Sequence, residues 1–323
     1  MGLGPTWISP ILGVSAASFL IILGAALLCQ KKNHRVMGAV LLLLMLVSMW
    51  IQKNRKIAQD TSVRVAAVQS EASDFDTYVA LTRTLTLEER KKTDIILWPE
   101  HAILYDVRRD VREWGILTEL AEESDSLIVV GTQTALEDGK WYNTALSLNS
   151  DGAIGEPYKN HTVHFFDDGV AGTEAKAVVT PRWKMGTPIC FDCDYQDVIR
   201  RMVADGAEFL MIPSMDGIDW GEKQHYQHAE LFGHRAAENG RWVVVAATSG
   251  VTQVIDPYGN RMKSLPIIDE GVLTAEIGSN DHLTIYTRIG WLFPWVTMCI
   301  GGIWLLWIFV QGIKEKRQSR TPK

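Results

Sequence analysis

Three long apolar runs divide this 323-residue chain and limit what it can fold into. They cover residues 7–29, 36–51 and 291–310, and none of them contains a charged residue. About 20 apolar residues can cross a bilayer as a helix, so we predict two membrane spans before the central region and one after it. The alternatives are buried core helices and, for the first run, a cleaved signal peptide. The basic flank of that run follows it rather than precedes it, which favours a retained helix.

Basic residues predict how these spans are oriented. Lys31, Lys32 and Arg35 lie between the first two spans. Those after the third span are Lys314, Lys316, Arg317, Arg320 and Lys323. Basic loops favour the cytoplasm, which predicts a multi-pass protein of the cell (inner) membrane whose central region lies on the outer, periplasmic face. The basic residues beside the second span argue for the opposite orientation; they are Lys53, Arg55 and Lys56.

The cysteines do not form a pattern typical of a disulfide framework. Two of the four lie in the apolar runs, whereas Cys190 and Cys193 form a C-x-x-C pair in the central region. Such a pair can be a redox site or half of a metal site, but the neighbouring carboxylates would raise both thiol pKa values. H-x-x-H pairs at residues 161–164 and 225–228 could bind zinc, yet nothing in the sequence places them near Cys190. We expect no metal and no cofactor.

The central region alternates between strand and helix patterns. Apolar stretches at residues 63–69, 94–98 and 126–131 predict buried strands, and the periodic stretches 74–90 and 107–124 predict helices. This alternation predicts an α/β fold in which helices cover a sheet. The net charge of −6 gives no reason to expect nucleic acid as a partner.

The second half of the region continues with a hairpin and an irregular segment. The further predicted elements are a hairpin of 142–148 and 154–158, strands at 184–190, 208–213, 242–247 and 251–255, and a helix at 223–239. Residues 159–180 fit neither pattern, and such a segment in a compact domain is more often functional than accidental.

Polar residues follow three of the predicted strands. Glu100 comes after the strand that ends in LWP, Lys159 follows the hairpin, and Cys190 ends its own strand just before a helix-like stretch at 194–206. A helix N-terminus favours a thiolate and can stabilise an oxyanion. A nucleophile, a carboxylate base and a cation at one sheet edge would suit acyl transfer through a thiol. Each residue alone also has a simpler interpretation, as a solvated loop residue or, for the cysteine, a core residue.

The motifs LWPE at 97–100, YKNH at 158–161 and ICFD at 189–192 resemble, in order and context, those of the nitrilase (carbon–nitrogen hydrolase) superfamily. Within it the chain is most similar to the apolipoprotein N-acyltransferase branch. The further segments that carry this likeness are 142–145, 229–241, 249–259 and 283–290. The resemblance implies a nitrilase-like αββα sandwich as a catalytic domain at residues 61–286. Residues 1–60 would then hold two transmembrane helices and a linker, and residues 287–323 a third helix and a basic cytoplasmic tail.

The resemblance also implies roles for individual residues. Glu100 would be the general base and Cys190 the nucleophile, and Lys159 would stabilise the oxyanion with the backbone N–H of Phe191. The second carboxylate of the family lies eight positions after the lysine and falls here on Asp167, which would orient Lys159. Asp192 would hold a backbone turn or the acceptor amine. We expect the cation to lower the thiol pKa and partial desolvation to raise the pKa of the base.

The resemblance implies a membrane-bound N-acyltransferase. Cys190 would take an acyl chain from a phospholipid as a thioester and pass it to an amine such as a lipoprotein N-terminus. The alternatives are a membrane-anchored amidase that acts on a small amide or nitrile, and a catalytically silent scaffold. The chain departs from the acyltransferase branch in having fewer spans before the domain, in residues 161–167, and in residues 213–220, which are closer to general amidases.

Overall fold

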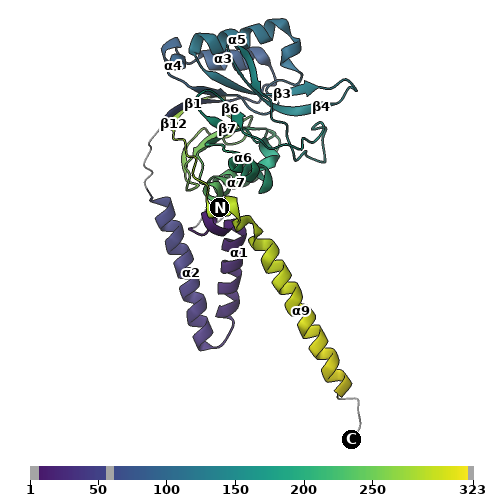
Figure 1. Cartoon of the computed structure of the whole chain (residues 1–323). Helices are drawn as coiled ribbons and strands as arrows, with labels where there is room; N and C mark the ends of the chain where they lie inside the picture. The colour runs from purple at the N-terminus through teal and green to yellow at the C-terminus, as the bar shows by residue number, and fades with distance from the viewer. Residues whose placement is uncertain (1–6, 56–61, 319–323) are drawn as a thin grey trace.

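The computed structural model describes residues 7–55 and 62–318, which form two packed β-sheets, outer helices and three long apolar helices (Figure 1). The first sheet has the order β12-β1-β2-β3-β4-β5 and the second β11-β10-β9-β8-β7-β6. The first comprises β12 (Gly271–Ile277), β1 (Val63–Gln69), β2 (Ile95–Leu97), β3 (Leu127–Ala135), β4 (Trp141–Asn149) and β5 (Gly152–Gly155). The second comprises β11 (Arg261–Ser264), β10 (Gln253–Ile255), β9 (Val243–Ala247), β8 (Phe209–Ser214), β7 (Lys184–Gly186) and β6 (Val178–Val179).

Helices cover the outer face of each sheet (Figure 1). Those over the first sheet are α3 (Phe75–Arg83), α4 (Leu87–Lys91) and α5 (Val111–Ser124), and those over the second are α6 (Asp197–Ala204) and α7 (Glu222–Asn239). In β1, Val63 and Val65 face the core between the sheets, whereas Ala66 and Val68 face the helices. Both faces are buried from Val65 to Val68, so that stretch is continuously apolar, whereas Arg64 near the start of the strand is exposed. The predicted αββα sandwich is confirmed.

The parallel strands in the middle of each sheet position the candidate site residues. Strand β2 pairs in parallel with β1 and β3, and β8 pairs in parallel with β7 and β9. Glu100 follows β2, Cys190 follows β7, and Met215 is the first residue after β8. The loops beyond the carboxyl ends of parallel strands are the usual place for a binding crevice in such sheets.

Several predicted elements differ from those in the structure. The helix expected at 74–90 is two helices, because Thr86 forms a capping box with Glu89 and starts α4. Asp110 caps α5, so that helix begins after a short 3₁₀ turn, η1 (Val107–Arg109). The strand expected to end in Cys190 stops at Gly186, and Cys190 instead begins the 3₁₀ turn η2 (Cys190–Cys193). Strand β12, which pairs with β1 along its whole length, was not predicted.

Within residues 7–55 and 62–318, three helices are long and apolar enough to cross a membrane: α1 (Ser9–Leu28), α2 (Lys32–Lys53) and α9 (Phe293–Gln318). All three extend to the same side of the sandwich (Figure 1). They match the three predicted spans. Of the basic flanks, Lys56, Arg320 and Lys323 lie outside the described residues, as do residues 56–60 of the predicted linker.

The first apolar helix is attached directly to the sandwich. Its backbone is non-helical at Gly13, and the backbone N–H of Val14 donates a hydrogen bond of 2.9 Å to Oε1 of Glu238 on α7. Glu238 is buried and lies 2.8 Å from the guanidinium of Arg235. This contact fixes the start of α1 against the helix that also lines the candidate site.

Candidate active site

Glu100 lies in a tight turn after β2 and is almost fully buried. Its backbone approaches β3 so closely that a Cβ added to Gly131 would lie 2.1 Å from the carbonyl oxygen of Pro99 and 2.5 Å from Cα of Glu100. Only glycine leaves room for this approach. The carboxylate accepts hydrogen bonds from Asn143 Nδ2 at 2.7 Å and from the backbone N–H of Met215 at 2.8 Å.

Lys159 places its ammonium between two buried carboxylates. Its Nζ lies 2.7 Å from Oε1 of Glu100 and 2.7 Å from Oδ2 of Asp168. Asn143 Nδ2 also donates to Oδ1 of Asp168 at 2.7 Å, so the amide joins the same two carboxylates. The structure thus brings together two of the three residues that we expected at the sheet edge, Glu100 and Lys159, in one ion-paired group.

Cys190 reaches this group from the other sheet. Its thiol donates to the carbonyl oxygen of Met215 at 3.5 Å, and the N–H of the same Met215 contacts Glu100. Cys190 has φ of +42° and His101, next to Glu100, has φ of +55°. A left-handed backbone is uncommon outside glycine and clusters at functional sites. Two of the four such residues in the described part of the chain therefore lie at the thiol and beside the carboxylate.

A pocket of about 380 Å³ opens over the thiol. Glu100 and Cys190 both line it, and most of its remaining wall is apolar. The apolar lining residues are Val163, Phe165, Phe166, Phe191, Met215, Trp220 and Leu231. Phe165 comes from the irregular segment after Lys159 and is 79% exposed. The site therefore joins a buried charged group to an apolar cavity that is open to the outside.

Burial and the neighbouring charges shift the pKa values of these groups. Burial raises the pKa of the Cys190 thiol well above its usual value, Glu100 raises it further, and Lys159 only partly offsets them. Burial also raises the pKa of Glu100, but Lys159 and His101 together bring it below the ordinary value. This differs from the expected raised pKa, because the ammonium lies in direct contact with the carboxylate. Glu100 is thus ionised and able to accept a proton.

The supporting carboxylates differ from the expectation in one case. Asp168, not Asp167, contacts Lys159; it is buried, accepts a hydrogen bond from the N–H of Val163, and has its pKa held at about 2 by His101 and Lys159 in spite of burial. Asp167 is exposed and accepts a bond from Gly169 N–H. The expected position is wrong by one residue, because it was counted as a fixed number of residues after Lys159. The path of the irregular segment, which decides which carboxylate reaches the lysine, cannot be obtained from such a count.

Asp192 connects the lysine segment to the cysteine turn. Its carboxylate accepts hydrogen bonds from the backbone N–H groups of Asn160, His161 and Ile189 at 2.8–3.1 Å. Burial raises its pKa to about 6 in spite of these donors. Of the two roles expected for Asp192, its contacts are those of a residue that holds a backbone turn. Phe191, the other supporting residue, lines the pocket.

The possible metal and redox motifs do not converge. Cys190 belongs to the core between the sheets and Cys193 to the core under α6 and α7, so the two thiols lie in different layers. His161 contacts Asp197, whereas His228 contacts Asp216. Neither H-x-x-H pair appears in a group of three or more metal-ligand side chains within residues 7–55 and 62–318.

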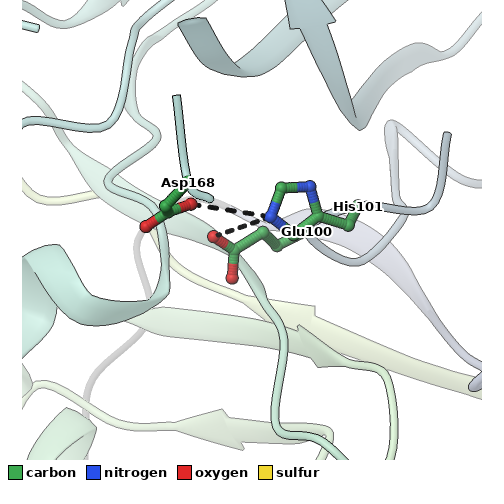
Figure 2. A group of neighbouring side chains, drawn as sticks. All are labelled: Glu100, His101 and Asp168. Atoms are coloured by element: carbon green, nitrogen blue, oxygen red, sulfur yellow. Dashed lines mark ion pairs between the residues drawn. The ribbon is translucent and has the colours of Figure 1, made fainter. Parts of the chain in front are cut away.

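One such group does occur, and it is the charged group itself. Figure 2 shows Glu100, His101 and Asp168 turned toward one another, with Nε2 of His101 3.9 Å from Glu100 and 3.6 Å from Asp168. The Lys159 ammonium already lies between the two carboxylates and supplies the positive charge that a metal would bring. His101 and Asp168 were not among the expected site residues; the position of His101 directly after the LWPE motif was the available signal.

Comparison with known proteins identifies the family. Residues 64–282 match the carbon-nitrogen hydrolase family. The apolipoprotein N-acyltransferase of Pseudomonas aeruginosa is 28% identical over 96% of this chain and 67% of its own length. That of Geobacter metallireducens is 28% identical over 65% of this chain and 44% of its own length.

Solved structures show the same fold. The C. elegans NitFhit protein matches with a TM-score of 0.58 and 21% identity, over 68% of this chain and 62% of its own. A Nesterenkonia amidase, solved with an acetamide moiety covalently added at its active-site cysteine, matches with a TM-score of 0.58 and 16% identity, over 72% of this chain and 96% of its own. With 219 of its 323 residues inside the family match (residues 64–282), the chain belongs to the carbon-nitrogen hydrolase family.

Proposed function

We propose that this protein is a membrane-bound, thiol-dependent N-acyltransferase. Cys190 is the nucleophile, Glu100 the general base, and Lys159 the group that stabilises the oxyanion. The observation that carries the proposal is the pocket, because the thiol and the base face a cavity whose wall is mostly apolar. Such a cavity suits a hydrocarbon chain better than a small polar amide. The names of the curated relatives support the same reaction class.

In the first half of the reaction, Glu100 accepts the proton of the Cys190 thiol, and the thiolate attacks the ester carbon of a phospholipid. Negative charge develops on the carbonyl oxygen, where the Lys159 ammonium and the Phe191 N–H stabilise it. When the carbon–oxygen bond to the glycerol breaks, Glu100 gives its proton to the leaving oxygen. The acyl group then remains on Cys190 as a thioester.

In the second half, a neutral amine attacks the thioester carbon. Glu100 takes a proton from the amine, and the carbon–sulfur bond breaks. The proton returns to the Cys190 sulfur, and the product leaves as an amide. An amine at a lipoprotein N-terminus is the acceptor that the names of the relatives suggest.

The apolar helices keep the pocket near its donor. With α1, α2 and α9 in the bilayer, the sandwich lies at one membrane surface (Figure 1). The turn between α1 and α2, with Lys31 beside it, points away from the sandwich. Basic turns favour the cytoplasm, so the catalytic domain lies on the outer face of the inner membrane. Phe165 and Phe166 at the pocket rim provide an apolar path for the lipid chain.

The experiment compares transfer with hydrolysis. Purified protein in detergent is given a phospholipid with a labelled acyl chain and a peptide with a free N-terminal amine, and in parallel a small aliphatic amide. We expect label on the peptide, no ammonia from the amide, and the same result for Cys193→Ala. Release of ammonia without transfer would instead assign the amidase activity that the amidase-like fold makes the second candidate.

A further inference from the structure

A buried ion pair between Asp216 and His228 lies beside the pocket. This ion pair has no role in the proposed reaction. Nδ1 of His228, on α7, lies 2.5 Å from Oδ1 of Asp216, and its Nε2 lies 3.4 Å from Oδ1 of Asp194. Burial lowers the pKa of His228, but the two carboxylates outweigh this and raise it to about 10. His228 also lines the pocket that contains the thiol. Each ring nitrogen of His228 thus faces a carboxylate, as a buried polar group generally requires.

Asp216 directly follows Met215, the residue whose backbone contacts both Cys190 and Glu100. Met215 accepts a bond from the Cys190 thiol through its carbonyl and donates to Glu100 through its N–H. Both bonds come from the backbone, so the orientation of this one residue affects the thiol and the base together. Connecting segments are more mobile than the strands that precede them, so the position of Met215 depends on how the residues after it are held.

Contacts on several sides fix Asp216. Its N–H donates to Oγ1 of Thr248, and the same hydroxyl donates back to its carbonyl, each at 3.2 Å. Its carboxylate lies against Gly250, where an added Cβ would come within 1.9 Å of Oδ2. His228 holds the other oxygen. The side chain is thus held between α7 and the segment after β9.

We propose that the His228–Asp216 pair is a positioning pair that fixes the Met215 backbone and thereby aligns Cys190 with Glu100. His228 is a positioning residue and takes no part in proton transfer to the substrate, because both of its nitrogens are directed at carboxylates. The inference rests on the proposed roles of Cys190 and Glu100.

The test measures the reactivity of the thiol without any acyl substrate. In a Cys193→Ala background, iodoacetamide alkylation of the peptide that carries Cys190 is followed by mass spectrometry. We expect His228→Gln to slow alkylation about tenfold, the effect of one lost buried hydrogen bond to a charged group. His228→Asn loses the same positive charge but can place its amide nitrogen where Nδ1 lies and keep the bond to Asp216, so it should react at least about threefold faster than His228→Gln.

Two further variants separate this role from a general loss of folding. His234→Gln, on the same helix but outside the pocket lining, should alkylate at the original rate. Gly250→Ala changes no polar group but displaces the Asp216 carboxylate, and it should slow alkylation as His228→Gln does. All rates are compared between variants with the same thermal transition.

The inference is overturned if His228→Gln or Gly250→Ala reacts at the original rate, or if His228→Asn loses as much as His228→Gln. Because alkylation requires no phospholipid and no amine, the result does not depend on acyl transfer. A chain that fails the transfer assay can still show the predicted order of alkylation rates, so failure of the proposed function and failure of this inference are distinguishable.

Discussion

Replacing Asp168 by asparagine tests which carboxylate supports Lys159. The asparagine can still accept from Asn143, but its amide group would face the Lys159 ammonium and the Val163 N–H, both of which are donors. The variant therefore loses two hydrogen bonds of a buried ionised network. A hydrogen bond to a charged group contributes about 1.5–3 kcal/mol. We expect a net loss of about 3 kcal/mol in transition-state stabilisation, or roughly a hundredfold in rate.

The assay is single-turnover acylation of Cys190, followed by intact mass after addition of phospholipid, with a thermal transition for each variant. Asp167→Asn is the matched control, because that carboxylate is exposed and its recorded hydrogen bond joins it to a residue two positions away. We expect it to change the free energy of unfolding by less than about 0.5 kcal/mol and the rate little. A larger loss for Asp167→Asn than for Asp168→Asn would refute the reasoning.

Three further predictions follow from the same contacts. Cys190→Ser should lower acyl transfer by more than about a thousandfold, whereas Cys193→Ala should keep most of it, as measured by labelled-peptide formation. The pKa of Asp168 is lowered to about 2, so the stability that its charge contributes is present above about pH 4 and is lost as the pH falls toward 2. The thermal transitions of the original protein and of Asp168→Asn should therefore converge between about pH 4 and pH 2. Gly131→Ala should displace the turn that carries the proposed base, which would lower the stability by about 1–3 kcal/mol and the transfer rate at least about tenfold. Gly115 has open space around it, so Gly115→Ala should change neither the stability nor the rate in this way.

The sequence predicted the strands better than the contacts between them. Residues 63–69 and 94–98 were predicted as strands because both faces of a central strand are buried, which makes residues 65–68 and 95–98 continuously apolar. Glu100 is the first charged residue after this apolar stretch, which made it recognisable as a candidate site residue. Strand β12 was missed although exposed Thr274 and Glu276 alternate with less exposed apolar residues, a pattern typical of a half-buried strand; its pairing with β1, some two hundred residues earlier in the chain, has no local signature.

The candidate site shows where counting along the chain fails. Asp168 reaches Lys159 because the irregular segment folds back through the bond from Val163 N–H to its carboxylate, a contact with no periodic signature. The pKa of Glu100 was misjudged for a similar reason, since burial alone raises it, and the nearby Lys159 and His101, whose positions the sequence does not show, reverse the direction. By contrast, the break between α3 and α4 was readable, because Thr86 and Glu89 form a capping-box pattern.

The central claim is that Cys190 carries the acyl group. The most direct measurement is the mass of the intact protein after incubation with phospholipid in the absence of an amine, followed by mapping of the modified peptide. We expect one fatty acyl adduct on Cys190 that hydroxylamine removes and that disappears when an acceptor amine is added. An unmodified Cys190 under conditions in which the protein transfers acyl groups, or an adduct on Cys193 instead, would contradict it.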